Sequence, residues 1–485
     1  MSRKKVVLNY IYSSFYQLFL IIVPLITAPY LARTLLPTAV GINSYVSSIV
    51  QIFSLLGLIG LNNYSIREIA YVREDKNKLR KTFSELFFLR FLCLIITVVV
   101  YLIYAYFSEY RLYFIVQLVA VLGAFVDISW FYAGLEEFRM TVTRSFIVKL
   151  INVTCIFTFI HSPSDLYLFM MISSVFSLLG NSILYLGVKK RAGKLQVRNL
   201  DIKKHVVPTL KLFLPQVASL VYLQCDKIMI NFLSDNVSNV GFYDQAERII
   251  KMPLALITAL STVMLPRVAN EFKKNNVETV KKYVTLALKF SLFMSIPLMF
   301  GIASIAGTMI PWFLGKGYED VVNIMITLSP IVLFISLSSV TGNQYLTAVN
   351  KTKVLTISYI VSALVNLVIN FLLIPIYGPV GAAIGTISAE MCVILIQLLY
   401  IREIVTFNEL FKMGIKYFVA GSIMAISCYY IGNHFGPTIL STILQILFGT
   451  FIYFGILLIV RDEFFFDNIN KIYSLIRKKI KSRKA

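Results

Sequence analysis

The sequence VGFYDQAERIIKMPLALITALSTVMLPR, residues 240–267, is long enough to cross a lipid bilayer as one helix, since a crossing takes about 20 residues. Its first half nevertheless contains Asp244, Glu247, Arg248 and Lys251. These positions stand at i, i+3, i+4 and i+7, so on a helix they form one stripe. A charged side chain in hydrocarbon costs at least ~2.5 kcal/mol. The stripe is therefore predicted to face other helices or a water-filled cavity, with Lys251 about 16 Å along the helix, near the bilayer midplane.

The whole chain has the composition of a membrane protein. Of its 485 residues, 58% are hydrophobic and 14% are charged, whereas soluble domains contain about 25% charged residues. Apolar runs of membrane-spanning length recur to the end of the sequence, and the first run is too long for a cleaved signal peptide. We predict an all-α polytopic membrane protein with about fourteen transmembrane helices, at residues 8–32, 39–65, 83–108, 112–134, 144–161, 165–188, 207–233, 240–266, 283–310, 320–347, 354–375, 379–401, 411–433 and 437–460.

The distribution of basic residues predicts the orientation of these helices. With the N-terminus inside, the predicted cytoplasmic segments hold 39 of the 46 lysines and arginines, as the positive-inside rule requires. Both termini are therefore predicted to be cytoplasmic. The net charge of +22 is explained by this topology and by attraction to anionic membrane lipids. Nucleic-acid binding is excluded as its explanation, because no basic soluble domain is present.

An internal similarity divides the chain into repeats. LPTAVGINSY at 36–45 corresponds to NVSNVGFYDQ at 236–245, and Arg67 corresponds to Arg267, all at an offset of 200 residues. Six helices per repeat give both copies the same orientation, related by a pseudo-twofold axis along the membrane normal. We expect two six-helix bundles, two additional transmembrane helices and a basic cytoplasmic tail, at residues 1–200, 201–402, 403–460 and 461–485.

Three stretches resemble a known family. YSIREIAYVRED at 64–75, CDKIMINFLSDNVSNVGFYDQAERI at 225–249 and IPIYGPVGAAIGTISAE at 374–390 are similar to signature segments of Wzx-type polysaccharide flippases. These belong to the multidrug/oligosaccharidyl-lipid/polysaccharide (MOP) exporter superfamily. The first span contains only Arg33, near its outer end, and lacks the arginine-rich start typical of the related lipid II flippases. The resemblance therefore favours a capsule or surface polysaccharide unit over a peptidoglycan precursor as cargo.

The resemblance implies a function in the bacterial plasma membrane. It implies alternating access that moves an undecaprenyl-pyrophosphate-linked oligosaccharide from the inner to the outer leaflet, around a central cavity between two bundles. Polysaccharide polymerase and other synthesis proteins are the further partners to be expected for such a flippase.

Cationic groups at mid-depth suit a pyrophosphate, because arginine offers forked donors and lysine a point charge. We predict Arg248 and Lys251 as ligands of the pyrophosphate; the alternative is an internal ion-pair network with Asp244 and Glu247. Arg90, inside the third span, is a further candidate, with snorkelling to the inner face as the alternative.

The remaining candidate residues have other predicted roles. Asp226 matches an acid that recurs in the family, and it is predicted to be an acid of the cavity, in one network with Asp244 and Glu247. The alternative is an interfacial pair of Asp226 with Lys227. Asp127 and Glu390 are lone intramembrane acids that could couple transport to H⁺ or Na⁺, or be satisfied structural carboxylates. Arg67 and Arg267 are predicted to anchor helix ends or to latch an inner gate. No catalytic residue, metal site or other cofactor is predicted.

Three classes of function compete. The chain contains no H-E-x-x-H motif and no phosphate-binding loop of the ATPase type, so we expect a transporter rather than an enzyme. A cation-coupled multidrug-type exporter of the same superfamily is the alternative. A membrane glycan polymerase or ligase is more distant, because the outer connections are too short for an acceptor site.

Overall fold

The structure is a computed structural model that describes residues 3–58 and 60–467. Helices occupy most of these residues, and no β-strand occurs among them. Eleven helical stretches in the described chain are long and apolar enough to cross a membrane. The chain is therefore an all-α multi-pass membrane protein, which confirms the predicted fold class. The number of fourteen spans and the pseudo-twofold axis remain predictions.

By packing, the chain divides into two compact units, and the division falls between Asp244 and Gln245. The predicted boundaries at residues 200, 402 and 460 follow sequence repeats rather than packing, so they stay predictions. Of the predicted basic tail, residues 468–485 lie outside the described residues.

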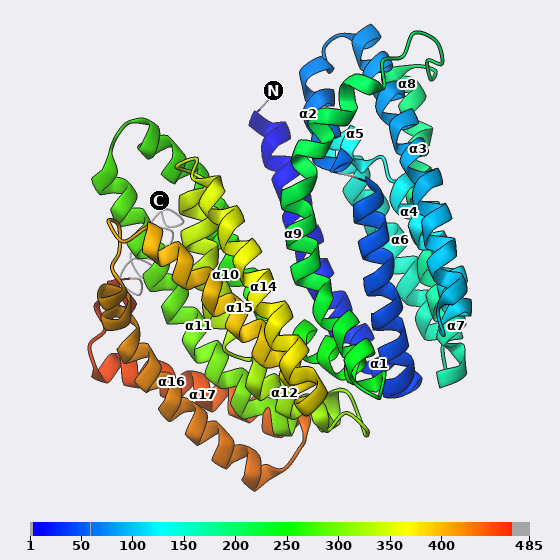
Figure 1. The fold of residues 1–485 in the computed structure, drawn as a ribbon. Coiled ribbons are helices and arrows are strands. Elements are labelled where there is room, and N and C mark those ends of the chain that lie inside the picture. The colour runs from blue at the N-terminus through cyan, green and yellow to red at the C-terminus, as the bar shows by residue number, and fades with distance from the viewer. Residues whose placement is uncertain (1–2, 59, 468–485) are drawn as a thin grey trace, which may run out of the picture. The chain divides into compact units, whose positions relative to one another are not determined.

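The first unit begins with one long, kinked helix and is otherwise built from helices of very different lengths (Figure 1). Its elements are α1 (Arg3–Leu58), α2 (Leu61–Val72), α3 (Lys76–Phe107), α4 (Arg111–Val126), α5 (Ser129–Gly134), α6 (Phe138–Phe159), η1 (Pro163–Asp165), α7 (Leu166–Ile183), η2 (Leu184–Gly187), α8 (Val188–Ala192), α9 (Lys203–Leu233) and the start of α10 (Ser238–Lys273). Helix α1 packs against α3, α4, α6 and α9.

The second unit contains the rest of α10 and the C-terminal helices. Its elements are α11 (Val277–Phe313), α12 (Asp320–Leu328), α13 (Ile331–Ser338), the π-helical segment η3 (Ser339–Leu346), α14 (Thr352–Tyr377), α15 (Pro379–Tyr400), α16 (Phe407–Phe435) and α17 (Ile439–Ile459). Helices α14 and α15 form one antiparallel pair, and α16 and α17 pack on α11.

Two irregular points divide the N-terminal helices. Leu36 has a φ of 64° and interrupts α1, at the position where the sequence predicts the outer connection between the first two spans. The proline that follows, Pro37, suits the first turn of a new helical segment because its missing N–H has no partner there. At the other end Gly60 adopts a left-handed φ of 77° before α2, so the predicted span 39–65 is completed by a separate short helix.

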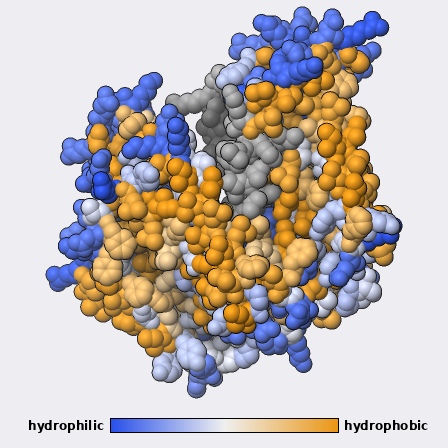
Figure 2. Space-filling view, viewed as in Figure 1, coloured by the Kyte–Doolittle hydropathy of each residue, from blue (hydrophilic) through white to orange (hydrophobic). Residues whose placement is uncertain are grey.

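The surface of each unit fits a lipid environment. Large apolar side chains are exposed along the helices, among them Ile96 on α3, Phe371 on α14 and Phe451 on α17. On the face drawn in Figure 2, hydrophobic residues cover the middle of each unit and hydrophilic residues gather at both ends. Exposed apolar surface of this extent is typical of membrane contact rather than of a soluble protein.

Apolar packing joins the last two helices to the second unit. Leu292 and Ile296 of α11 and Met424 of α16 belong to one buried cluster, and the hydroxyl of Tyr453 on α17 donates a hydrogen bond of 2.8 Å to the Phe293 carbonyl. Helices α16 and α17 are therefore integral to this unit.

Candidate functional site

Helix α10 is continuous across the charged stretch that the sequence singled out. It runs from Ser238 to Lys273 and includes two prolines. Along it, Asp244 and Glu247 are buried, whereas the side chain of Arg248 is exposed and that of Lys251 is 35% exposed. The stripe therefore has an acidic part that contacts protein and a basic part that solvent can reach.

Asp244 is held by residues from two other helices. The Nζ of Lys227 on α9 lies 2.7 Å from its Oδ1, and the hydroxyl of Ser44 on α1 donates a 2.8 Å hydrogen bond to its Oδ2. The carboxylate side chain is only 2% exposed. A buried carboxylate needs such partners because desolvation alone is strongly unfavourable.

Asp226 belongs to the same region of the first unit. It precedes Lys227 on α9, is buried, and accepts a hydrogen bond of 2.7 Å from the hydroxyl of Tyr243 on α10. On α9, Asp226 thus contacts Tyr243 of α10, and the next residue, Lys227, contacts Asp244.

One turn further along α10, Lys251 and Glu247 form an ion pair with a Nζ–Oε1 distance of 2.5 Å. Together with Arg248, this gives two cations and one anion on this turn of the helix. The net charge of the group is therefore positive, and its cations Arg248 and Lys251 are the accessible members. Such a group can attract an anion.

Two glycines allow α1 and α10 to approach closely. A Cβ atom on Gly41 would lie 2.1 Å from the carbonyl oxygen of Val237, and one on Gly241 would lie 2.8 Å from the Gly41 nitrogen. Beside them the hydroxyls of Thr38 and Ser238 are 3.0 Å apart. Residues separated by 200 positions therefore touch at this crossing, at the same offset that the sequence similarity indicated.

Arg90 is almost completely buried, with 2% exposure, where the fourth span is interrupted between α4 and α5. Its guanidinium donates hydrogen bonds to Asn62 Oδ1 at 2.8 Å and to the backbone carbonyls of Ala124 and Asp127 at 3.3 and 3.1 Å. It also lies over the ring of Trp130, 5.6 Å from the centroid. These contacts satisfy carbonyl groups that the interrupted helix leaves without helical partners, and they differ from snorkelling to the inner face.

Asp127 occupies the interruption itself. Its carboxylate accepts hydrogen bonds from the backbone N–H and the hydroxyl of Ser129, at 2.8 and 3.0 Å. These bonds to the residue two positions on form an Asx turn that leads into the short helix α5, whose N-cap residue is Ile128. The arrangement gives Asp127 a structural role, and its predicted part in ion coupling stays a prediction.

Glu390 is buried in the middle of α15. The facing part of α14 contributes Asn366 and Asn370, also buried, with a hydrogen bond of 3.2 Å between their side chains. A Cβ on Gly385 would lie 2.0 Å from the Asn370 Oδ1, so this glycine lets the two helices meet at the polar cluster. The predicted role of Glu390 in ion coupling is not tested by these contacts.

Arg67 and Arg267 lie on different units and are both exposed. Arg67 on α2 is paired with the neighbouring Glu68 at 3.3 Å and lies over the ring of Tyr64, 5.3 Å from its centroid. Arg267 is near the end of α10. Their predicted roles as anchors or as a gate remain predictions.

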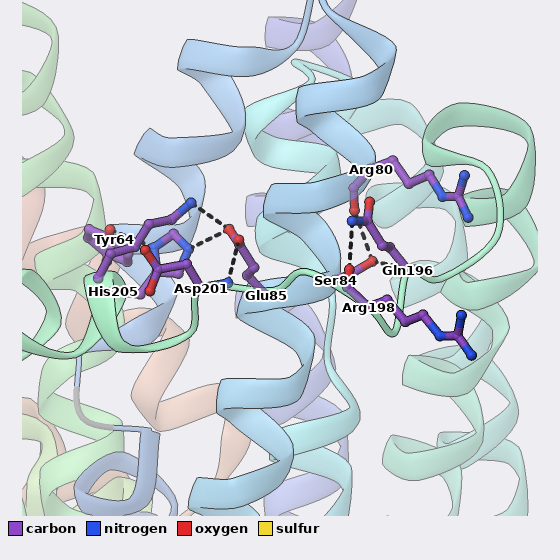
Figure 3. Close-up of polar contacts among 9 residues, drawn as sticks. Tyr64, Arg80, Ser84, Glu85, Gln196, Arg198, Asp201 and His205 are labelled. Atoms are coloured by element: carbon purple, nitrogen blue, oxygen red, sulfur yellow. Dashed lines mark hydrogen bonds and ion pairs between the residues drawn. The ribbon is translucent and has the colours of Figure 1, made fainter.

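The sequence did not single out a buried polar cluster around Glu85 on α3, which is drawn in Figure 3. Its carboxylate is paired with Lys204 Nζ at 2.7 Å, lies 3.0 Å from His205 Nε2, and accepts the backbone N–H of Asp201 at 2.9 Å. The other ring nitrogen of His205 lies 2.7 Å from the hydroxyl of Tyr64 on α2.

The segment between α8 and α9 crosses α3 beside Ser84 and Glu85 (Figure 3). Arg80 Nε donates to the Lys194 carbonyl at 2.6 Å, and the Gln196 N–H donates to the Ser84 hydroxyl at 2.9 Å. These contacts fix the connection into α9 against α3. The sequence offered two signals for this cluster: Glu85 lies inside a predicted span, and His205 lies just before a later predicted span. Because 120 residues separate the two, the sequence alone did not indicate that they are in contact.

A pair of short helices, α2 and α5, is held together near the predicted cytoplasmic side of the first unit. Gly134 of α5 lies against Ile69 of α2, where a Cβ would meet side-chain carbons at 2.7 Å. At their ends Arg73 and Glu136 form an ion pair at 2.8 Å, which raises the pKa of Arg73 above its ordinary value.

The second unit also contains an apolar cavity of about 370 Å³ between α11, α16 and α17. Its lining includes Pro297, Met424, Gly449 and Phe454. The cavity offers few polar groups, so its chemistry suits a hydrocarbon chain.

Comparison with known proteins agrees with this architecture. The polysaccharide biosynthesis protein family matches residues 6–272, and the MatE family matches residues 213–372. A relative from Escherichia coli K12, named as an O-antigen transporter, is 24% identical over 404 residues, covering 81% of this chain and 96% of that protein. The lipid II flippase MurJ of Bacillus subtilis 168 is 24% identical over 186 residues, or 37% of this chain and 34% of that one.

Solved structures show the same fold. A lipid II flippase MurJ in an inward closed conformation superposes with a TM-score of 0.73 at 19% identity, covering 94% of this chain and 99% of that one. An inward-facing multidrug resistance MATE transporter of the MOP superfamily gives 0.61 at 15% identity, with coverages of 81% and 99%. Because the family match extends over more than half of the sequence, the chain belongs to the polysaccharide biosynthesis protein family and, as predicted, to the MOP superfamily of transporters.

Proposed function

We propose that this protein is a flippase for a lipid-linked glycan, namely an undecaprenyl-pyrophosphate-linked oligosaccharide unit used for capsule or surface polysaccharide. Translocation from the inner to the outer leaflet of the bacterial plasma membrane would occur by alternating access, with both termini in the cytoplasm. The family, and the relatives named as O-antigen transporter and lipid II flippase, support a lipid-linked glycan as substrate.

The observation that carries this proposal is the accessible cationic pair on α10. Arg248 and Lys251 are three residues apart at the predicted midplane depth of span 240–266, and the acids beside them are buried. A pyrophosphate needs positive charge at such a depth, where the energetic cost of an unpaired anion is high. Arginine binds it through forked hydrogen bonds and lysine through a point charge.

The chemistry of other residues suggests where the prenyl chain binds, which acids couple transport to an ion and which partners the protein has. The apolar cavity between α11, α16 and α17 is suited to part of the prenyl chain. Glu390, buried in α15, and Asp127, whose carboxylate accepts two hydrogen bonds from Ser129, are the candidates for H⁺ or Na⁺ coupling. Polysaccharide polymerase and anionic lipids are the proposed partners, the latter through the basic cytoplasmic segments.

Deleting the gene from its host tests the proposal. We expect surface polysaccharide to disappear and lipid-linked oligosaccharide to accumulate on the cytoplasmic side, and we expect a plasmid copy of the gene to restore export. Normal surface polysaccharide in the deletion strain would contradict the proposal.

A cation-coupled exporter of amphipathic compounds is the second candidate, favoured by the MatE match over residues 213–372. The same deletion strain distinguishes the two functions. Increased sensitivity to cationic drugs, together with unchanged lipid-linked oligosaccharide, would support the exporter. A membrane glycan polymerase or ligase remains the most distant alternative.

A further inference from the structure

A neutral polar face on α1 lies at membrane depth and is not used by the function proposed above. Asn43, Ser47, Gln51 and Ser54 follow one another at intervals of three or four residues, so they share one face of the helix. All four are partly or fully exposed, Gln51 most clearly, whereas the neighbouring Ser48 is buried. The accessible side of this part of α1 is therefore lined by amide and hydroxyl groups.

The depth of this face excludes a simple interfacial role. Gln51 is 14 residues after Pro37, or about 21 Å along the helix at 1.5 Å per residue. At this depth an amide that faced lipid would lose its hydrogen bonds with water without replacement. The face is consequently expected to be in contact with water or with a polar ligand.

Helix α9 adds a second amide to the face. The Nε2 of Gln224 donates a hydrogen bond of 3.1 Å to the Oε1 of Gln51. The Oε1 of Gln224 is buried and accepts no hydrogen bond from the described residues. The exposed amide of Gln51 therefore offers the hydrogen-bonding capacity for a further polar group, as a donor through Nε2 and as an acceptor through the second lone pair of Oε1.

The face on α1 differs in charge from the equivalent positions on α10, as the alignment of the two repeats shows. At the offset of 200 residues that the contacts Thr38–Ser238 and Ser44–Asp244 share, Ser47 corresponds to Glu247 and Gln51 corresponds to Lys251. Equivalent positions are thus charged on α10 and neutral but polar on α1. The face on α1 thus offers neutral hydrogen-bonding groups at positions where its repeat equivalent carries charges.

We propose that the face formed by Asn43, Ser47, Gln51 and Ser54, together with Gln224, binds the glycan of the lipid-linked substrate. Sugar hydroxyls donate and accept hydrogen bonds, and neutral amides and hydroxyls match both functions without the desolvation cost of a charge. This inference rests on the proposed flippase function and assigns the glycan to residues separate from those that bind the pyrophosphate.

Binding to two probes tests the assignment. The full-length protein in lipid nanodiscs is titrated with undecaprenyl pyrophosphate and, separately, with the lipid-linked oligosaccharide extracted from the deletion strain. We expect wild-type protein to bind the glycosylated probe more tightly. Replacing two hydrogen-bonding groups in the variant Ser47→Ala/Gln51→Leu should weaken that binding about tenfold and leave binding of undecaprenyl pyrophosphate unchanged.

Ser48→Ala is the matched control, because this buried serine is on the same helix and donates to the Ser44 carbonyl. It should bind both probes as wild type does, and Gln224→Ala should behave like the double variant. Unchanged preference for the glycosylated probe in Ser47→Ala/Gln51→Leu would overturn the inference, as would an equal loss for both probes. Wild-type protein that binds neither probe would instead contradict the proposed function itself.

Discussion

The buried ion pair between Lys227 and Asp244 gives a quantitative prediction. Its Nζ–Oδ1 distance is 2.7 Å, and the two side chains are 12% and 2% exposed. The variant Lys227→Met keeps most of the aliphatic length and removes the positive charge. Removing one partner of a buried pair costs about 3–5 kcal/mol, because the other charge stays desolvated. We expect the free energy of unfolding to fall by that amount.

The double variant Lys227→Met/Asp244→Asn separates charge from packing. It removes both charges, so we expect it to recover most of the stability that the single variant loses. Unfolding can be followed in detergent with a thiol-reactive dye, since Cys93 is buried in α3 of the same unit. A single variant that unfolds at the wild-type temperature, or a double variant as unstable as the single one, would refute the reasoning.

Three further predictions concern the crossing, the interrupted span and the topology. Gly41→Ala places a Cβ 2.1 Å from the Val237 carbonyl oxygen, so α1 and α10 must separate. We expect surface polysaccharide to fall sharply when this variant is used to complement the deletion strain. Normal export by the variant would contradict the close approach of the two helices. Arg90→Met should lower the free energy of unfolding by about 1–3 kcal/mol, because the carbonyls between α4 and α5 lose their donors, whereas Arg90→Lys should recover part of the loss. Lys316→Cys should react with a membrane-impermeant thiol reagent added outside intact cells and Lys274→Cys should not; the opposite pattern would invert the topology.

Much of the architecture follows from the sequence because its signals are local. Apolar length predicts membrane-spanning helices, and the 36–45 and 236–245 similarity anticipated that residues 200 positions apart would correspond. The structure adds that Thr38 and Ser238, and Ser44 and Asp244, are in direct contact. A shared local pattern can reveal equivalence, but contact depends on how the helices cross.

The features that the sequence did not predict are of two kinds. Some are contacts between residues far apart in the chain, and one is a helix interruption at which the sequence has no proline. The fourth span is interrupted at Asp127 without a proline, and the carbonyl of Asp127 accepts a hydrogen bond from Arg90, which is 37 residues away. The cluster at Glu85 needs His205 from another helix. Within the charged stripe, only the structure separates the buried acid Asp244 from the exposed Arg248.

Export by the double variant Arg248→Gln/Lys251→Gln tests the central claim most directly. The control Lys273→Gln removes one positive charge from an exposed position near the end of the same helix. We predict that the double variant reaches the membrane in wild-type amount, produces no surface polysaccharide and accumulates lipid-linked oligosaccharide, while the control exports normally. Export at the wild-type rate by the double variant would show that the accessible cations of α10 do not bind the substrate.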